Sequence, residues 1–171
     1  MLPLDPPLVL DPGALPAPPR DGRQSERALA IRRGTGRLLR HLGFAMLPEV
    51  TLASGRRADV VALSGRGEIW IVEIKSSVED LRADTKWPSY KDFCDRLFFA
   101  THPEVPADVF PRGEGLIVSD GYAAEIVRPA GEARLASARR KAMTLRFAEL
   151  AARRLHDLED PLALGADGPW R

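Results

Sequence analysis

Three charged side chains on two neighbouring hydrophobic segments form the pattern in this sequence that could do chemistry. Asp59 opens the segment "DVVAL", and Glu73 and Lys75 close the segment "EIWIVEIK". Hard divalent cations such as Mg²⁺ prefer oxygen ligands and keep several waters, so two carboxylates and a backbone carbonyl make a sufficient protein site. A lysine beside such a site can stabilise negative charge on a phosphate. The three groups together are suited to phosphodiester hydrolysis.

Strand geometry predicts that these side chains lie close together. Side chains alternate between the two faces of a strand, so Glu73 and Lys75 point to the same face. A strand at 58–63 is expected to pair with a strand at 68–75 through the turn "SGRG". An antiparallel pair sets the start of one strand beside the end of the other. We therefore expect Asp59, Glu73 and Lys75 to meet at one rim of a sheet.

The rest of the chain predicts an α/β fold with helices around one mixed sheet. Helical periodicity, a Ser25 N-cap and a break at Pro88 give the helices, and short apolar runs between turn residues give the strands. Helices are expected at 25–41, 78–100 and 137–158. Strands are expected at 44–52, 58–63, 68–75, 115–120 and 124–128.

One face of the last predicted helix is expected to pack against the domain. Its apolar residues recur at helical spacing, which is typical of a helix with one buried stripe. The residues of this predicted face are Ala142, Leu145, Ala148, Leu150, Ala151 and Leu155.

The segments that carry the charged residues resemble a family of nucleases. "RRADVVAL" followed by "EIWIVEIKSS" resembles the core of the PD-(D/E)xK nuclease superfamily. The run "GEIWIVEIKSSVEDLRADTKWPSYKDFCDRLFFAT", with "GLIVSDGYAAEIVR" after it, is similar to the bacterial MmcB family of DNA repair proteins. The resemblance covers roughly 26–155. It implies a restriction-endonuclease-like α-β-β-β-α-β core, with a central mixed sheet flanked by helices, and a Mg²⁺-dependent nuclease acting in DNA repair.

The resemblance also implies roles for individual residues. By the superfamily motif, Asp59 and Glu73 would be metal ligands together with the backbone carbonyl of Ile74, and Lys75 would be the catalytic lysine. Mg²⁺ is the cofactor that the motif implies, with Mn²⁺ as an alternative. Ala58 stands where the motif has its proline, a change that removes no ligand.

Several further side chains are candidates for the same site. Many relatives use an additional glutamate, for which Glu26 and Glu49 compete. Glu26 lies near the start of the first helix, far from the strand rim, whereas Glu49 shares a face with Asp59 only if the hairpin has the right register. We favour Glu49 as the near-site residue. The segment after Lys75 adds three side chains that could reach the site: Lys86, Tyr90 and Asp95.

Two of these candidates also have structural interpretations. Tyr90 has the character of a core aromatic residue. Asp95 lies beside Arg96 and could form an internal ion pair instead of reaching the site.

Basic residues are unevenly distributed although the net charge is only +1. The segments 20–40 and 134–154 are rich in arginine and flank a more acidic middle. Such segments could follow a phosphate backbone, because lysine and arginine supply most sequence-independent affinity for nucleic acid. Arginine-rich helices can also simply have solvated outer faces. The candidate DNA-contacting residues are Arg33, Arg56, Arg57, Arg139, Arg140 and Lys141.

Composition predicts how the chain is organised. Seven of the fifteen prolines lie in the first 22 residues, so we expect a Pro-rich arm at 1–23 that is disordered or laid over the surface. The nuclease-like domain is expected at 24–158 and a tail at 159–171. No apolar run reaches the roughly 18 residues that a membrane span needs, and no signal-peptide pattern opens the chain. We therefore expect a cytoplasmic protein without membrane association.

The sequence leaves several functions open. The first hypothesis is a metal-dependent DNA endonuclease, and the second is a nuclease-fold protein that binds DNA or a repair partner with little or no cleavage. A third, an RNA nuclease, remains because a metal site does not discriminate between sugars. The charged cluster favours an enzyme, because clustering like charges is costly. A homodimer is also compatible with the sequence.

Overall fold

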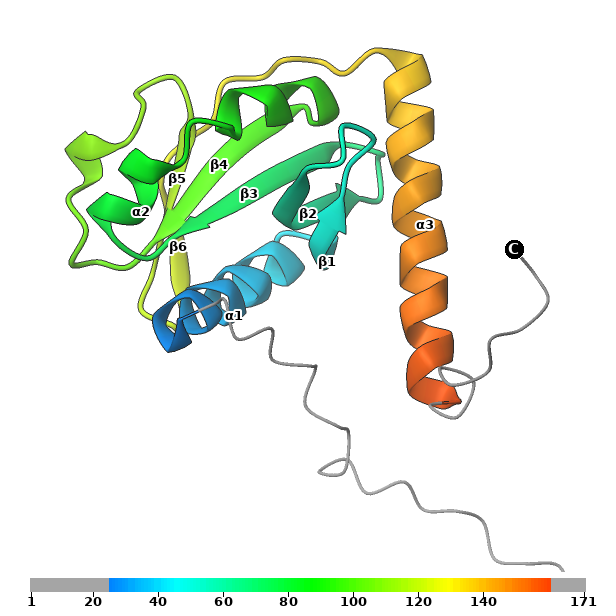
Figure 1. The fold of residues 1–171 in the computed structure, drawn as a ribbon, viewed down its shortest axis with the longest axis horizontal. Coiled ribbons are helices and arrows are strands. Elements are labelled where there is room, and N and C mark those ends of the chain that lie inside the picture. The colour runs from blue at the N-terminus through cyan, green and yellow to red at the C-terminus, as the bar shows by residue number, and fades with distance from the viewer. Residues whose placement is uncertain (1–24, 161–171) are drawn as a thin grey trace, which may run out of the picture.

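A computed structural model describes residues 25–160, and these form a six-stranded mixed sheet covered by helices on both faces (Figure 1). The predicted arm and all but the first two residues of the predicted tail lie outside the described residues. The strands are β1 (Phe44–Thr51), β2 (Arg57–Ser64), β3 (Ile69–Lys75), β4 (Arg96–Thr101), β5 (Gly115–Ser119) and β6 (Ala124–Arg128). The helices are α1 (Glu26–His41), α2 (Val78–Ala83) and α3 (Ser137–Glu159), with 3₁₀ turns η1 (Trp87–Phe93) and η2 (Ala107–Val109).

The strand order in the sheet is the same as the order in the chain, β1 to β6. The first three strands form an antiparallel meander, β4 and β5 continue it in parallel to β3, and β6 returns antiparallel. The predicted mixed sheet and the predicted meander are confirmed. Val60 pairs with Val72 between β2 and β3, so Asp59 and Glu73, one residue further along, lie side by side.

The prediction of one helix over 78–100 is wrong. The helix α2 ends at Ala83, η1 begins with Pro88 in its first turn, and Arg96–Thr101 forms the central strand β4. Every residue from Leu97 to Thr101 is buried. A short run that is apolar at almost every position fits a buried parallel strand as well as a helix, so periodicity could not separate the two.

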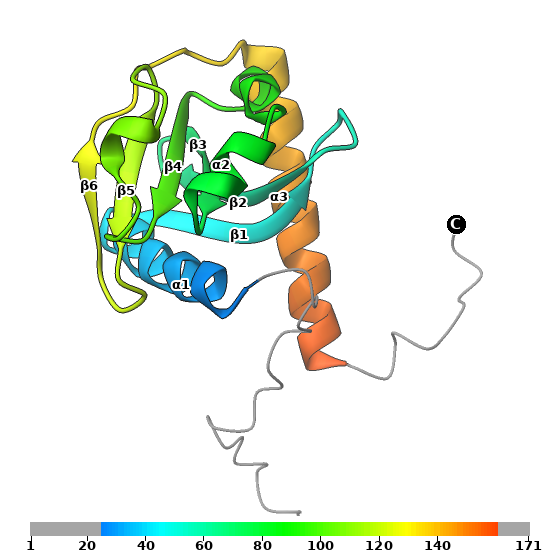
Figure 2. The same cartoon turned by 60° about the vertical axis from the view of Figure 1, so that its left-hand side comes forward.

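The helix α1 covers one face of the sheet (Figure 2). Ile31 and Leu39 are completely buried against side chains of the central strands, among them Val72 and Phe98. Ser25 caps the helix, because its hydroxyl accepts a hydrogen bond from the Ala28 N–H. The capped first turn lies close to the start of β2 and the end of β3, because Ser25 and Ala28 line the same pocket as Asp59 and Glu73.

The opposite face is covered by α2, η1 and α3, and the predicted packing face of α3 is wrong for most of its residues, although Leu150 packs against the core. The helix buries Met143 and Phe147, whereas Leu145 and Leu155 are exposed. Apolar residues occur on more than one side of α3, so spacing alone could not show which side packs on the domain. Figures 1 and 2 show α3 at the edge of the domain, with its last turns extending beyond the sheet.

A partly buried ion pair ties the start of α3 to the sheet. Two guanidinium nitrogens of Arg140 donate to the carboxylate of Asp95, at 2.7 and 2.6 Å. The same carboxylate accepts the backbone N–H groups of Ile69 and Leu135, both at 2.8 Å. Burial alone would raise the pKa of Asp95, but these hydrogen bonds hold it below its ordinary value. Asp95 therefore works as a charged clamp between β3, β4 and α3.

We predict that Asp95→Asn lowers the free energy of unfolding by about 3 kcal/mol. The substitution leaves Arg140 unpaired and turns an acceptor into a donor that faces an N–H group. Urea denaturation at neutral pH measures the change. The matched control is Asp92→Asn, since Asp92 pairs with Arg139 at an exposed position, and we expect a change below about 0.5 kcal/mol. If the two substitutions lowered the free energy of unfolding equally, the proposed stabilising role of the Asp95–Arg140 pair would be wrong.

Candidate functional site

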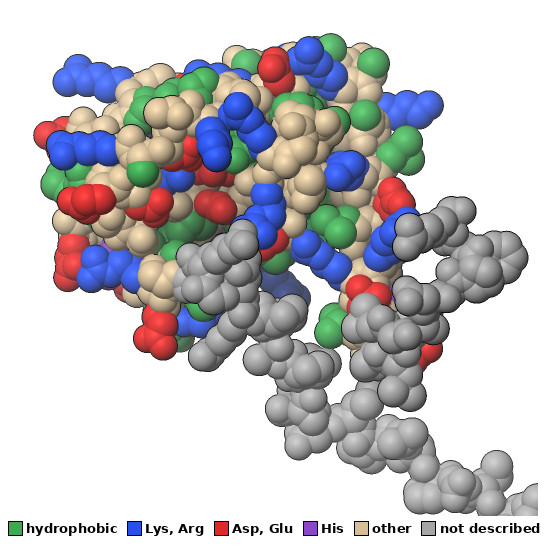
Figure 3. Space-filling model, in the orientation of Figure 1, with side chains coloured by type: hydrophobic (Ala, Val, Ile, Leu, Met, Phe, Trp, Pro, Cys, Tyr) green, Lys and Arg blue, Asp and Glu red, His purple; other side chains and the backbone are tan. Residues whose placement is uncertain are grey.

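A pocket of about 510 Å³ lies where β3 ends, between the start of α1 and the segment from α2 to η1. Asp59, Glu73, Ile74 and Lys75 all line it. The structure therefore brings together the residues that the sequence singled out. In Figure 3 acidic side chains gather over α2 and the neighbouring strand ends, and Lys and Arg side chains surround them.

Backbone groups fix the two carboxylates against each other. The Asp59 N–H donates to Glu73 Oε1 at 3.2 Å, and the Ile74 N–H donates to Asp59 Oδ2 at 2.8 Å. One oxygen of each carboxylate is thus held by a neighbouring strand. The second oxygens, Asp59 Oδ1 and Glu73 Oε2, belong to side chains that line the pocket. Two carboxylates in this arrangement are a suitable donor set for a hard divalent cation.

Burial makes this pair of acids electrostatically costly. Glu73 is only 3% exposed, and burial followed by the negative charge of Asp59 raises its pKa to about 8. The pKa of Asp59 is raised as well, chiefly by burial, although the Ile74 N–H and Lys75 act in the opposite direction. A divalent cation between the carboxylates would counter this cost, so the two residues fit the metal that the motif implies.

Lys75 is held as a cation by an acid that the sequence did not single out. Its Nζ lies 2.6 Å from Asp84 Oδ2, and the side chain is almost completely buried. Burial alone would lower the pKa of Lys75, but the hydrogen bond and charge of Asp84 outweigh it, and the pKa is raised. Lys75 is therefore suited to stabilising negative charge rather than to accepting a proton.

Asp84 follows the last residue of α2 and caps the helix. Burial would raise the pKa of Asp84, but hydrogen bonds from Lys75 and from backbone N–H groups lower it. Nothing in the local sequence separates Asp84 from the other acids of this segment, Glu79 and Asp80. The helix α2 ends at Ala83 and Asp84 follows in an extended conformation, and its carboxylate accepts a hydrogen bond from Lys75.

Two further hydrogen bonds hold the strands around the pocket. Tyr90 lines the pocket, and its hydroxyl donates to the Arg57 carbonyl at 3.0 Å. Thr101 donates to the Lys75 carbonyl at 2.7 Å, which joins β4 to the end of β3. Burial raises the pKa of Tyr90, so this residue contributes a neutral hydroxyl. Lys86 also lines the pocket, with an exposed side chain.

The two competing glutamates lie in different places. Glu49 lies beside Asp59 in the β1–β2 register. Burial is the main cause of the raised pKa of Asp59, and the negative charge of Glu49 acts in the same direction. Its carboxylate forms ion pairs with Arg57 at 2.6 Å and with Arg32 at 3.6 Å, and it does not line the site pocket. Glu26 is exposed in the first turn of α1. Glu49 is thus near the site, and neither glutamate lines the pocket.

Asp95 does not reach the site, contrary to the prediction. It precedes β4, and because β3 and β4 are parallel it lies at the opposite end of the sheet from Lys75. The alternative prediction of an internal ion pair describes Asp95 correctly, but its partner is Arg140 rather than Arg96.

The predicted DNA-contacting residues differ in their surroundings: some have structural roles within the domain, one lines the site pocket, and others are exposed. Arg140 is used by the Asp95 clamp, and Arg56 donates to the Lys86 carbonyl and the Ser89 hydroxyl, so both guanidinium groups have structural roles. Arg57 lines the site pocket and pairs with Glu49. Three other candidates are exposed: Arg33, Arg139 and Lys141.

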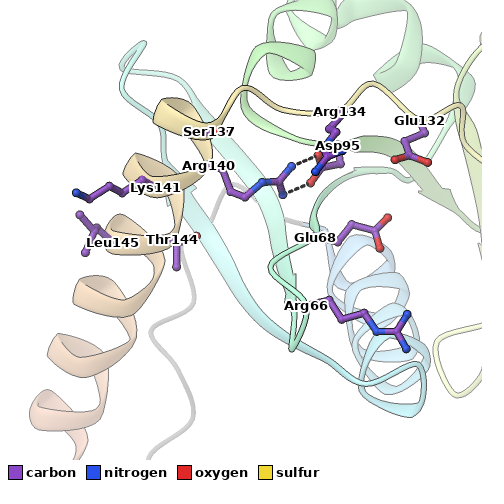
Figure 4. A pocket seen from close by; sticks show the side chains of 10 residues that line it. All are labelled: Arg66, Glu68, Asp95, Glu132, Arg134, Ser137, Arg140, Lys141, Thr144 and Leu145. Carbon is purple, nitrogen blue, oxygen red and sulfur yellow. Dashed lines mark hydrogen bonds and ion pairs between the residues drawn. The ribbon is translucent and has the colours of Figure 1, made fainter.

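A second hollow, of about 700 Å³, lies at the opposite end of the sheet between the β2–β3 turn and the start of α3 (Figure 4). Each carboxylate that lines it is tied to an arginine. Asp95 pairs with Arg140, and Glu68 and Glu132 both pair with Arg96. These acids are already neutralised, so this hollow is a poor cation site despite its larger volume.

Residues 25–160 contain no group of three His, Cys, Asp or Glu side chains placed to hold a metal ion. A cation in the site pocket would therefore have two carboxylate ligands, completed by backbone or water oxygens. In the same part of the chain, no helix is both long and apolar enough to cross a membrane.

Fold and site together define an α/β protein in which the start of β2 and the end of β3 bring together the partly buried Asp59, the buried Glu73 and a lysine held by a third acid. The chain belongs to the MmcB-like family, because the family model described as DNA repair protein MmcB-like matches residues 15–162. A similar solved structure is the SPO1766 protein of unknown function from Silicibacter pomeroyi. The two sequences are 44% identical, the match covers 86% of this chain and 99% of that chain, and the TM-score is 0.79. No curated protein matches the sequence.

The raised pKa of Glu73 predicts how the stability of the metal-free protein depends on pH. Between 4.5, its ordinary value, and about 8, folded Glu73 keeps a proton that the unfolded chain has lost. The free energy of unfolding should therefore fall as pH rises through this window. Glu73→Gln should remove this part of the slope and be more stable than the unsubstituted protein near the upper end of the window.

Urea denaturation in EDTA at both ends of that window measures the effect. The exposed Glu26→Gln is the control and should keep the slope of the unsubstituted protein. If Glu73→Gln also kept that slope, the proposed burial and repulsion at Glu73 would be wrong.

Proposed function

We propose that this protein is a metal-dependent DNA endonuclease of the PD-(D/E)xK superfamily that hydrolyses phosphodiester bonds in DNA repair. The observation that carries the proposal is the convergence of Asp59, Glu73 and Lys75 in one pocket at the end of β3. The order of α1, the β1–β3 meander, α2 and β4 supports the superfamily. The description of the family as DNA repair proteins supports DNA as the substrate.

In this proposal each residue has a distinct role. Asp59, Glu73 and the Ile74 carbonyl would hold Mg²⁺ or Mn²⁺, which when bound would lower the pKa of a water ligand and polarise a phosphate oxygen. The Lys75 ammonium would stabilise the negative charge that develops on the phosphate. Asp84 would position Lys75 and keep it protonated.

The energetic cost of the site supports catalysis over a purely structural role. At the opposite end of the sheet, the buried Asp95 is matched by a bidentate arginine. Asp59 and Glu73 have no arginine in that role, and their pKa values are raised instead of lowered. Two neighbouring acids whose pKa values are raised by burial and repulsion, and which line a pocket, are typical of a functional site.

The helix α1 offers a route for the DNA backbone. Its first turn borders the site pocket, since Ser25 and Ala28 line it. Further along, Arg33 and Arg40 are exposed and line a groove of about 580 Å³ between α1 and β1. Neither arginine forms an ion pair with another residue of the described part of the chain. These two guanidinium groups are thus available to phosphates that pass along α1.

We predict that Asp59→Asn and Lys75→Met each lower the rate of DNA cleavage by about 100-fold or more. The first change removes a metal-binding charge and the second removes the cation that stabilises the phosphate. The assay incubates purified protein with fluorescent duplex, nicked, branched and single-stranded DNA, in Mg²⁺ or in EDTA. An RNA duplex of the same sequence tests whether the protein cleaves DNA in preference to RNA.

The control for Lys75→Met is Lys86→Met, which removes an exposed lysine that lines the same pocket. We expect it to keep most of the activity. Cleavage that survives unchanged in Asp59→Asn and Lys75→Met would refute the proposed site. Binding of DNA without cleavage by the unsubstituted protein would favour a binding protein over an enzyme.

We also predict that Arg33→Gln and Arg40→Gln weaken DNA binding mainly at low salt. Each contact between an arginine and a phosphate contributes about one unit to the slope of log affinity against log salt. The double substitution should lower that slope by about two, as measured by fluorescence anisotropy with Ca²⁺ in place of Mg²⁺. Arg112→Gln, at an exposed position before β5, is the control and should keep the slope.

A further inference from the structure

The helix α3 carries a second row of side chains that the domain leaves uncovered. All six members of this row, which we call the outer row, are exposed, with Leu145 at 60% and Leu155 at 56%. Their spacing alternates between four and three residues, as at the a and d positions of a coiled coil. The outer row consists of Lys141, Leu145, Ala148, Ala152, Leu155 and Glu159.

The outer row points away from the domain. In Figure 4, Lys141 and Leu145 project from α3 away from the sheet, whereas Arg140 in the same turn reaches Asp95. Met143 and Phe147 supply the buried packing of the helix. Figure 1 shows α3 at the edge of the domain, with no other described element on its outer side. The apolar members of the outer row are therefore not needed for packing among residues 25–160.

The outer row is self-complementary when two copies of α3 run in opposite directions. Its members form three pairs that are equally spaced about Leu150. Lys141 then meets Glu159 of the second copy, and Leu145 meets Leu155. Ala148 meets Ala152 at the centre, where small side chains let two helices approach closely. A parallel arrangement would instead set Lys141 against Lys141 and Glu159 against Glu159, so charge favours the antiparallel one.

We propose that the outer row of α3 is a homodimer interface, in which two copies of this chain pair antiparallel about a two-fold axis at the level of Leu150. Such an interface is closed, because the same surface is used on both subunits. The apolar contacts would cover Leu145 and Leu155, which a monomer exposes to water. The charged pairs at both ends would set the direction and register.

The residues beside the outer row are compatible with this arrangement. Leu158, which is 54% exposed, lies on the flank that would face Thr144 of the second copy. The two Glu149 side chains would approach each other near the axis. Each is already paired with Arg153 of its own helix at 2.7 Å, which reduces their repulsion.

The length of the outer row limits the strength of the dimer. Eighteen residue steps along an α-helix span about 27 Å, so one helix pair makes an interface at the small end of specific protein complexes. We therefore expect a dimer that dissociates on dilution, and sedimentation velocity over a wide range of concentrations is the measurement.

The first test uses Leu145→Glu, which places a charge in the apolar part of the outer row. We expect the dissociation constant to rise by at least about tenfold. The matched control is Val127→Glu, because Val127 is also an exposed apolar residue but lies on β6. Thermal unfolding of both variants checks that the fold is kept. A chain that is monomeric at every concentration, or a dimer that Leu145→Glu leaves unchanged, would overturn the proposal.

The second test uses the charges at the ends of the outer row. Lys141→Glu and Glu159→Lys should each weaken self-association, because each sets like charges against one another. An equimolar mixture of these two variants should recover the association, since each copy then meets the opposite charge on its partner. A parallel dimer would already set like charges against one another, so neither single variant should weaken it. An effect of the substitutions on the fold of one chain predicts weakening without recovery in the mixture. Either result would overturn the antiparallel interface. DNA cleavage is not part of this readout, so the test is independent of the proposed function.

Discussion

The structure depends on one constraint where β2 begins and β3 ends, because two carboxylates are held side by side there. The register that pairs Val60 with Val72 sets Asp59 beside Glu73, and the Asp59 N–H donates to Glu73. The backbone prevents the acids from moving apart, and their burial raises both pKa values. Lys75 only partly offsets this cost, because its ammonium is shared with Asp84. We propose that a bound divalent cation offsets the rest of this cost.

The two ends of the sheet show what distinguishes such a site from a structural charge. Asp95 is also buried, but it receives two hydrogen bonds from Arg140 and two from backbone N–H groups, and its pKa is lowered. That carboxylate stabilises the fold as an anion and has no capacity left for a ligand. Among residues 25–160, the hydrogen bonds to the acids at the other end come from backbone N–H groups, and both acids line an open pocket.

Strand alternation and turn patterns were sufficient to predict that Asp59, Glu73 and Lys75 meet. They were insufficient to predict β4, Asp84 and the packing face of α3. Alternation along β3 and the antiparallel turn before it were enough to bring Asp59, Glu73 and Lys75 together. The strand β4 was missed because a buried run is apolar at every position, so helical and strand periods look alike. Asp84 was missed because its position depends on where α2 ends. The packing face of α3 was misassigned because the helix has apolar residues on two sides, and only tertiary contacts show which side is buried.

The most direct test of the central claim is calorimetric titration of the metal-free protein with Mn²⁺ or Mg²⁺ near neutral pH, in two buffers of different ionisation enthalpy. We predict one bound ion per chain and release of a proton from the carboxylate pair, because Glu73 with a pKa of about 8 must ionise to bind the ion. Asp59→Asn and Glu73→Gln should lose this binding, and Asp84→Asn should retain it. Absence of binding, or binding that Asp59→Asn leaves unchanged, would contradict the account.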